Sequence, residues 1–304
     1  MTDDLTPATA TMAMRSPKKP KVVITGGSGF IGLHAVKQFK DLGWDIVVID
    51  NDSGYGVSTE GYQLIVADIA DFGAIEPWFE GADLVWHLAA KASIPEAILS
   101  PRQTMEVNVL GTCNVLQAAK RHFVKRVVVA STAALSGDAD PTANPYALSK
   151  STVEDLCQMY VNLYNLDVVV ARFFNVWGEG QHDCGAYAPV MAQFTRAMKN
   201  NETIMIFGDG EQTRDFINVK DVINAMLTLS LPNEKVSGKI FEVGTGQSCS
   251  INELLEIMDP KKTKGIYLNM PARLGEVRHS KADCSALMGL GWKPMVNLKE
   301  YFNE

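Results

Sequence analysis

The chain has 304 residues, 46% of them hydrophobic and 21% charged, a composition typical of a globular protein with one large domain or two modest ones. Its net charge of -7 argues against a nucleic-acid partner, which would need a basic face, and no apolar run approaches the roughly 20 residues that span a bilayer. The five cysteines are widely spaced without a Cys-x-x-Cys pair, and the five histidines have no ligand spacing. We therefore expect free thiols, a reducing cytoplasmic location, no membrane contact and no metal site.

Residues 1–20 are rich in Thr, Ala, Pro and Ser and lack the apolar core of a signal peptide, so we expect a flexible tail. From residue 21 onward, short apolar runs alternate with longer amphipathic stretches. The pattern predicts strands at Val22–Thr25, Ile46–Ile49, Leu64–Ala67, Leu84–Leu88, Val127–Ala130 and Val168–Phe173, and helices at Phe30–Leu42, Arg102–His122 and Tyr146–Asn165. Since the strands show little polar alternation, they predict an α/β fold with a Rossmann-type, doubly wound parallel sheet.

Beyond about residue 175 the predicted elements become shorter, and glycine-rich turns separate them. We predict a Rossmann domain over residues 21–175 with return segments near 213–245. A smaller C-terminal lobe is expected from residues 176–212 and 246–304. A ligand should lie in the cleft between the two.

A glycine-rich loop follows the first predicted strand and opens the first helix. Gly26 permits a tight turn, Gly29 lets backbone amides approach a pyrophosphate, and Gly32 lets the helix pack closely on the sheet. The helix N-terminus adds unpaired N–H groups and its positive end. The alternative is a glycine-rich turn without a ligand, and the position between a strand and a helix favours the dinucleotide site.

The second predicted strand ends at Asp50, an acid that would accept hydrogen bonds from adenosine ribose and repel a 2′-phosphate. No Lys or Arg occurs from Asn51 to Ala90 to neutralise such a phosphate. We therefore predict that the cofactor is NAD rather than NADP. Asp68, just past the third strand, is placed either to contact adenine or to cap a helix.

Tyr146 and Lys150 stand at i and i+4 on one predicted helix face, after a strand whose carboxyl end carries Thr132. Doubly wound sheets bind their ligands at this edge. A free phenol is a poor base because its pKa lies near 10, but a nearby ammonium and a positive nicotinamide would lower that pKa. Tyr146 would then take a hydroxyl proton while hydride leaves for NAD, with Thr132 bonded to the reacting oxygen. The alternative is an exposed Tyr–Lys pair without function.

These residues lie among ordered motifs that resemble those of the extended short-chain dehydrogenases/reductases, in the NAD-dependent epimerase/dehydratase family. The motifs are T-G-G-S-G-F-I-G at 25–32, W-H-L-A-A at 86–90, A-S-T-A-A at 130–134, Y-A-L-S-K at 146–150, R-F-F-N-V-W-G at 172–178, G-D-G-E-Q-T-R-D-F at 208–216, R-L-G-E at 273–276 and L-G-W-K-P at 290–294. The match runs from Lys21 almost to the C-terminus. The resemblance, strongest to UDP-glucose and UDP-N-acetylglucosamine 4-epimerases, implies a nucleoside-diphosphate-sugar substrate.

The resemblance also implies which residues form each site. The catalytic residues would be Thr132, Tyr146 and Lys150. The residues at the NAD site would be Gly26, Gly29, Phe30, Ile31, Gly32, Asp50, Asn51, Asp68, Ile69, Leu88, Ala89, Ala90, Asn108, Tyr146, Lys150 and Phe174. The residues at the nucleotide-sugar site would be Ser93, Thr132, Tyr146, Asn175, Ala186, Tyr187, Val190, Ile206, Phe207, Arg214, Arg273 and Glu276. Arg suits recognition of phosphate oxygens, although Arg214 has the alternative of pairing with Asp215 or another acid.

The residue after Thr132 bears on the reaction. Dehydratases and nucleotide-sugar decarboxylases of this family usually carry an acid there, whereas this chain has Ala133. Epimerisation needs no such acid, so we favour 4-epimerisation of a UDP-hexose or UDP-N-acetylhexosamine through a 4-keto sugar. One alternative is another NAD-dependent conversion: epimerisation elsewhere on the ring, dehydration, or net oxidation or reduction. Another is a non-catalytic NAD-binding regulator, which should have lost one of the three catalytic residues.

Three departures from the family pattern concern the later part of the site. Only seven residues separate Gly137 from Pro145, Ser136 replaces the usual Tyr, and the helix after Pro294 is short. The first departure leaves the sugar specificity open.

Relatives dimerise through the helices near 102–122 and 146–165, which implies a homodimer. Apolar residues recur at helical spacing in the first of these helices and fit that contact and ordinary core burial equally well. They are Met105, Val109, Cys113 and Leu116.

Overall fold

The structure is a computed structural model that describes residues 18–51, 60–137, 139–181, 189–231, 236–260, 266–272 and 277–303. Its main sheet is parallel throughout, with seven strands in the order β11-β6-β5-β4-β1-β2-β3. The strands are β1 (Lys21–Thr25), β2 (Asp45–Asp50), β3 (Gln63–Val66), β4 (Leu84–His87), β5 (Arg126–Thr132), β6 (Val168–Phe173) and β11 (Ile240–Val243). The predicted doubly wound α/β fold is therefore confirmed, and the six predicted strands agree with it to within two residues at either end.

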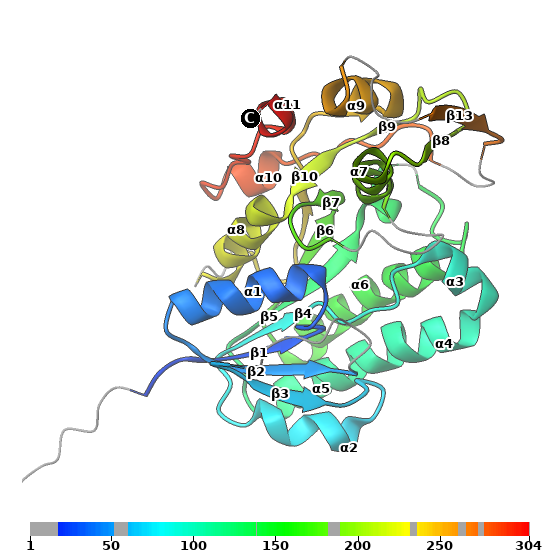
Figure 1. Cartoon of the computed structure of the whole chain (residues 1–304). Coiled ribbons are helices and arrows are strands. Elements are labelled where there is room, and N and C mark those ends of the chain that lie inside the picture. Colours follow the sequence, from blue (N-terminus) through cyan, green and yellow to red (C-terminus); the bar gives the residue numbers. More distant parts are fainter. Residues whose placement is uncertain are drawn as a thin grey trace, which may run out of the picture.

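Helices cover both faces of the main sheet (Figure 1). One face carries α1 (Phe30–Asp41), α8 (Val219–Ser230) and α10 (Ser285–Met288), and the other carries α2 (Phe72–Ile75), α5 (Gly111–Arg121) and α6 (Pro145–Tyr164). Alternate side chains of a strand enter the two cores: Val22 and Ile24 pack toward α1, and Val23 packs toward the opposite layer. Burial on both faces explains why the strands are continuous apolar runs.

The predicted helix near 102–122 has an unpredicted wide turn. α4 (Pro101–Met105) runs into a π-helical turn (Glu106–Leu110) and then into α5. The next residue, Gly111, has no room for a side chain, because a Cβ there would lie 2.6 Å from the side chain of Ile69. The close approach brings this helix against the end of β3. Short helices at α3 (Ile94–Leu99), Glu76–Phe79 and Ala133–Leu135 complete this part of the chain.

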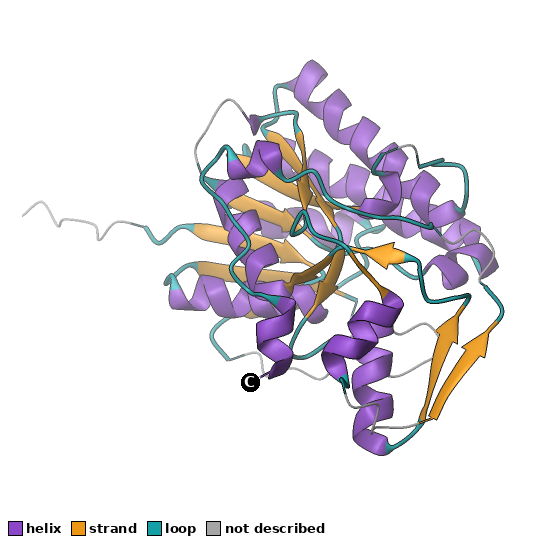
Figure 2. Ribbon diagram, turned by 90° about the horizontal axis from the view of Figure 1, so that it is seen from above, coloured by secondary structure: helices purple, strands orange, loops and turns teal. Residues whose placement is uncertain are grey.

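The later part of the chain forms three two-stranded pairs around a third core. The pairs are β7 (Asn175–Trp177) with β10 (Phe216–Asn218), β8 (Thr203–Phe207) with β13 (Ile266–Met270), and β9 (Thr213–Arg214) with β12 (Cys249–Ser250). Side chains of α7 (Val190–Asn200), α9 (Ile251–Met258) and α11 (Leu298–Asn303) pack in this core. Figure 2 shows the β8–β13 pair apart from the main sheet, at the right-hand edge. The exact domain boundaries stay a prediction.

The passage from the main sheet to these small sheets takes place at one peptide. The amide of Phe174 donates to the carbonyl of Val243 in β11 at 3.0 Å, and the next amide, that of Asn175, donates to the carbonyl of Asp215 at 3.0 Å. Consecutive residues therefore belong to different hydrogen-bonded frameworks. In the same region α8 and β11 return to the main sheet, within the predicted return segments.

Neither a membrane helix nor a metal cluster is found within the described ranges. Every helix there is too short or too polar to cross a bilayer. No three His, Cys, Asp or Glu side chains of the described part are grouped to hold a metal ion. The four cysteines in this part of the chain are all free thiols.

Asp215 is a fully buried acid that fastens the loop after β11. Its Oδ1 accepts from the amide and hydroxyl of Thr245, at 2.8 and 2.7 Å, and its Oδ2 accepts from the amides of Gly246 and Ala282, at 2.9 and 3.2 Å. A buried carboxylate with this many donors is costly to remove, because each donor is then left without a partner.

We predict that Asp215→Ala lowers the free energy of unfolding by about 3 kcal/mol or more, measured by urea denaturation. The matched control is Asp209→Ala, which removes an exposed acid paired with Arg278 at 2.8 Å and should leave the urea midpoint nearly unchanged. Equal midpoints for the two variants would contradict the role given to Asp215.

Candidate functional site

The loop between β1 and α1 is shaped by its glycines. Gly26 has φ 72°, and a Cβ on it would lie 2.6 Å from the backbone nitrogen of Ala89. A Cβ on Gly32 would collide with the carbonyl oxygen of Gly26. Gly29 differs, because a Cβ there would meet only the Gly26 oxygen, at 3.4 Å. Its outer side is open, so a pyrophosphate can approach the first amides of α1, which carries no side-chain cap. Phe30 and Ile31 form that first turn.

Asp50 lies at the end of β2, beside this loop. It is 7% exposed, and its Oδ2 accepts from the amide of Ser28 at 2.9 Å. The acid is therefore held where a dinucleotide would present its adenosine ribose. Asn51 follows it in an exposed position. The glycine loop and Asp50 together fit NAD.

Asp68 does not cap the next helix, so that alternative is wrong. Its Oδ1 accepts from the amide of Ala70 at 2.9 Å, whereas the cap of α2 is Asp71, whose Oδ1 accepts from the amide of Ala74. The adenine contact of Asp68 stays a prediction. Ile69 beside it is buried.

The segment after β4 also borders the glycine loop. The amide of Leu88 donates to the carbonyl of Thr25 at 3.0 Å, and the amide of Ala89 donates to the hydroxyl of Thr25 at 3.3 Å. Ala90 continues this segment, half-buried. Residues 88–90 therefore lie beside the predicted pyrophosphate, at the carboxyl edge of the sheet.

Tyr146 and Lys150 are both buried, at 9% and 5% exposure, so the alternative of an exposed Tyr–Lys pair is wrong. They lie in the first turns of α6, which Asn144 caps and Pro145 opens. The Lys150 Nζ donates to the carbonyl of Ala130 at 2.9 Å. The hydroxyl of Thr132 is hydrogen-bonded to the phenol of Tyr146. The structure thus brings the three predicted catalytic residues together at the end of β5.

The expected fall in the pKa of Tyr146 includes the effect of a bound nicotinamide and stays a prediction. Burial raises the pKa of the Tyr146 phenol, and the hydrogen bond from Thr132 acts in the opposite direction. Burial also lowers the pKa of Lys150 to about 8, against the opposing effects of Cys157 and Glu154. Burial therefore disfavours the charged form of both partners, and the Lys150 ammonium depends on nearby negative charge.

His87, a buried histidine on β4, joins β1 to the first turn of α5. The Thr112 hydroxyl gives its single proton to the carbonyl of Asn108 at 2.5 Å, so it must accept from Nε2 of His87 at 2.8 Å. Nδ1 of His87 then accepts from the hydroxyl of Thr25 at 2.7 Å. Burial and the Lys150 charge lower the pKa of His87 to about 3. The ring is therefore neutral, with one tautomer fixed by its partners.

Asn108 extends this chain of hydrogen bonds to α6. Its Oδ1 accepts from the amide of Lys91 at 2.8 Å, and its Nδ2 donates to the hydroxyl of Ser149 at 2.9 Å. Ser149 in turn donates to the carbonyl of Tyr146 at 2.7 Å. Asn108 is among the predicted site residues, whereas His87 and Ser149 are not. Both stand inside quoted motifs, W-H-L-A-A and Y-A-L-S-K, which was the available signal.

Several predicted nucleotide-sugar residues surround the junction of β7, β8 and α7. Asn175 and Val190 line a cavity of about 170 Å³ together with Trp177 and Phe216. Arg214 donates to the carbonyl of Thr213 at 2.8 Å. The remaining members are more scattered: Ile206 is buried in the third core, Phe207 ends β8, and Ser93 caps α3. Four others lie outside the described residues: Ala186, Tyr187, Arg273 and Glu276.

Ser136, which replaces the usual Tyr, has a buried hydroxyl with no hydrogen-bond partner among the described residues. It follows the short helix Ala133–Leu135, whose cap is the Thr132 side chain. A buried hydroxyl without a partner is uncommon. The position therefore offers a polar group near Thr132.

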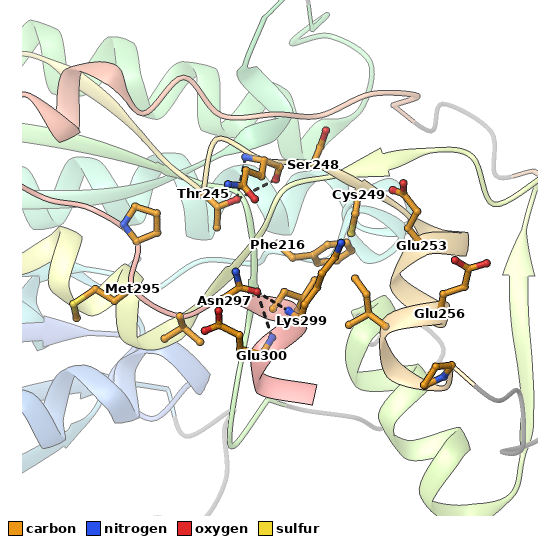
Figure 3. Close-up of a pocket in the computed structure, with 16 residues that line it drawn as sticks. Phe216, Thr245, Ser248, Cys249, Glu253, Glu256, Met295, Asn297, Lys299 and Glu300 are labelled. Atoms are coloured by element: carbon orange, nitrogen blue, oxygen red, sulfur yellow. Dashed lines mark hydrogen bonds between the residues drawn. The ribbon is translucent and has the colours of Figure 1, made fainter. Parts of the chain in front are cut away.

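A cavity of about 960 Å³ among the described residues lies elsewhere. Glu253 and Glu256 of α9 line one side, and Asn297 and Lys299 line the other, with Phe216 between them (Figure 3). None of the predicted site residues lines it. The larger cavity and the cluster of Thr132, Tyr146 and Lys150 are therefore separate features.

Comparison with known proteins places this geometry in context. The model of the NAD-dependent epimerase/dehydratase family matches residues 22–244. A UDP-glucose 4-epimerase of Mycolicibacterium smegmatis is 33% identical over 92% of this chain and 95% of its own. A UDP-N-acetyl-alpha-D-glucosaminuronate decarboxylase of Bacillus cytotoxicus is 32% identical over 78% and 79%. The solved structure of UDP-N-acetylglucosamine 4-epimerase from Methanobrevibacter ruminantium matches with a TM-score of 0.86 and 31% identity, covering 95% of this chain and 97% of its own.

We predict that Gly29→Ala and Gly32→Ala separate cofactor binding from folding. Gly29→Ala adds a methyl group on the open side of the loop at a φ that alanine adopts, so NAD affinity should fall about tenfold or more while unfolding of the free protein is unchanged. Gly32→Ala forces helix and loop apart and should lower the free energy of unfolding by about 2 kcal/mol. Calorimetry with and without NAD measures both effects. Equal NAD affinity for Gly29→Ala and the unaltered protein would refute the assignment of the loop.

Proposed function

The chain belongs to the NAD-dependent epimerase/dehydratase family, and we propose that it is a 4-epimerase of a UDP-hexose or UDP-N-acetylhexosamine. One observation carries this proposal. Thr132, Tyr146 and Lys150 meet at the end of β5, and the residue after Thr132 is Ala133 rather than an acid. Similarity to UDP-sugar epimerases over nearly the whole chain supports it. This chain has no acid after Thr132. It therefore lacks the usual proton carrier of the related dehydratases and decarboxylases.

The proposed reaction uses few groups. Tyr146 accepts the proton of the sugar 4-hydroxyl, and the Lys150 ammonium stabilises the phenolate. The hydroxyl of Thr132 donates to the reacting oxygen. NAD, when bound, supplies reversible hydride acceptance at C4. The keto sugar, now planar at C4, turns over in the cleft. The hydride returns to the opposite face of C4, and Tyr146 returns the proton to the oxygen, which gives the epimer.

The nucleotide would lie in the smaller lobe, residues 176–212 and 246–304. In this proposal Asn175 and Arg214 contact the diphosphate, while Ile206 and Phe207 border the base. The cavity between β7 and α7 supports this, since it lies next to Asn175 and Val190. A planar guanidinium is well suited to phosphate oxygens.

We also propose a homodimer through the helix pair 101–121 and α6. Of the four residues first assigned to this contact, Leu116 is fully buried in the core, and the other three are half-buried. The exposed apolar residues of the pair are Leu110, Leu148, Met159, Leu163 and Tyr164, with exposures between 37% and 69%. Burial of such a set is the usual reason for association.

Sedimentation should therefore show twice the chain mass of 33.2 kDa. Leu163→Asp places a charge in the proposed contact and should yield monomers with unchanged circular dichroism. Phe123→Asp, at a residue that is 89% exposed and outside these helices, is the matched control and should remain dimeric. A monomeric unaltered protein at micromolar concentration would rule out the dimer.

The reaction is tested by incubating the protein with UDP-, GDP- and dTDP-sugars. We expect a UDP-sugar to give a product of unchanged mass and different chromatographic mobility, because epimers are isomers. Tyr146→Phe should lower turnover about a hundredfold to ten-thousandfold, the usual contribution of acid–base catalysis, while NAD binding persists. A product that has lost water or carbon dioxide would contradict epimerisation, and full turnover by Tyr146→Phe would contradict the mechanism.

A further inference from the structure

Glu154, a buried acid, lies one helical turn beyond Lys150 on α6. Glu154 is 9% exposed, and three donors hold its carboxylate. Oε1 accepts from the hydroxyl of Ser131 at 2.6 Å and from Nε of Arg172 at 2.8 Å, and Oε2 accepts from Nη2 of Arg172 at 2.7 Å. The bidentate geometry fixes the guanidinium against the carboxylate. The site proposed above makes no use of this pair.

The acid belongs to the same framework as the catalytic groups. Tyr146, Lys150 and Glu154 follow one another at intervals of four residues on α6, and they bond to three successive residues of β5, 130–132. Glu154 and Lys150 are thus neighbours on one helix face that packs on one strand. Because both are buried, water screens their interaction poorly.

This arrangement supplies the negative charge that the Lys150 ammonium needs. Burial lowers the pKa of Lys150, and Glu154 opposes that effect. Arg172 pairs with the same carboxylate at 2.7 Å and partly cancels its charge. It also lies 4.0 Å from Glu242 of β11, so its own charge is shared between two acids.

We propose that Glu154 is a positioning residue that keeps Lys150 in its ammonium form, and that Arg172 limits how much of the Glu154 charge acts on Lys150. The balance between acid and guanidinium sets the pH at which Lys150 loses its proton. The proposal rests on the proposed function only for what the ammonium then does to Tyr146.

Other charges around Lys150 do not provide this balance. Burial raises the pKa of the Cys157 thiol to about 12, so the thiol is uncharged near neutral pH. His87 from β4 is neutral, and Tyr146 keeps its proton in the free protein because burial raises its pKa. The charged side chains on the helices packed against α6 are all at least partly exposed, so water screens them. They are Glu96, Arg102, Glu106, Lys120 and Arg121.

The test is a carbon-13 NMR titration of the full-length protein labelled at the lysine Cε, with the Lys150 signal assigned by its loss in Lys150→Met. Glu154→Gln should move the Lys150 midpoint down by about one pH unit, because a negative charge is lost. Arg172→Gln should move the same midpoint up, because the Glu154 charge is no longer cancelled. The controls Glu154→Asp and Arg172→Lys retain the charges and should titrate near the unaltered protein.

The opposite signs separate an electrostatic role from a packing role. Loss of packing alone would leave both midpoints in place or move them in one direction. The proposal is overturned if Glu154→Gln titrates at or above the unaltered midpoint, or if Arg172→Gln titrates at or below it. If Glu154→Gln does not fold, the direction in which Arg172→Gln moves the Lys150 midpoint is the test of the proposal. The titration uses no sugar substrate, so its result stands or falls separately from the epimerase reaction.

Discussion

The packing of α6 on β5 is the contact on which the rest of the site depends. Tyr146, Lys150 and Glu154 lie on one helix face and bond to three successive residues of one strand, 130–132. A strand in the middle of a parallel sheet cannot shift without breaking its ladders on both sides. The phenol, the ammonium and the buried acid therefore keep a fixed order and spacing, and NAD and sugar must come to them.

A second set of hydrogen bonds reaches the same helix from the cofactor side. His87 joins the strand that precedes the glycine loop to Thr112 at the start of α5, Thr112 bonds to Asn108 in the π-helical turn, and Asn108 bonds to α6. Every member is neutral or backbone, so the connection does not change with pH over the range in which enzymes work.

Features that depend on local pattern were predictable from the sequence. Apolar runs predicted six of the seven strands of the main sheet, β1 to β6, and glycine spacing predicted the shape of the first loop. Contacts between residues far apart in the chain were not predictable from the sequence. The hydrogen bonds of His87 and the Arg172–Glu154 pair are examples. Residue spacing shows that Lys150 lies beside Tyr146. It does not show that both side chains are buried, and burial disfavours the charged form of each. Strands of two or three residues, such as β9 and β12, are too short to show a period.

The single peptide between Phe174 and Asn175 has an evolutionary consequence. Phe174 on one side of it bonds to β11 of the main sheet, and Asn175 on the other side bonds to Asp215, next to the small sheets that border the proposed nucleotide pocket. Substitutions in the small sheets can accumulate without disturbing α6 and β5, which hold the predicted proton-transfer groups. In the proposed enzyme, selection can therefore change which sugar nucleotide is bound while the oxidising part of the site is inherited intact.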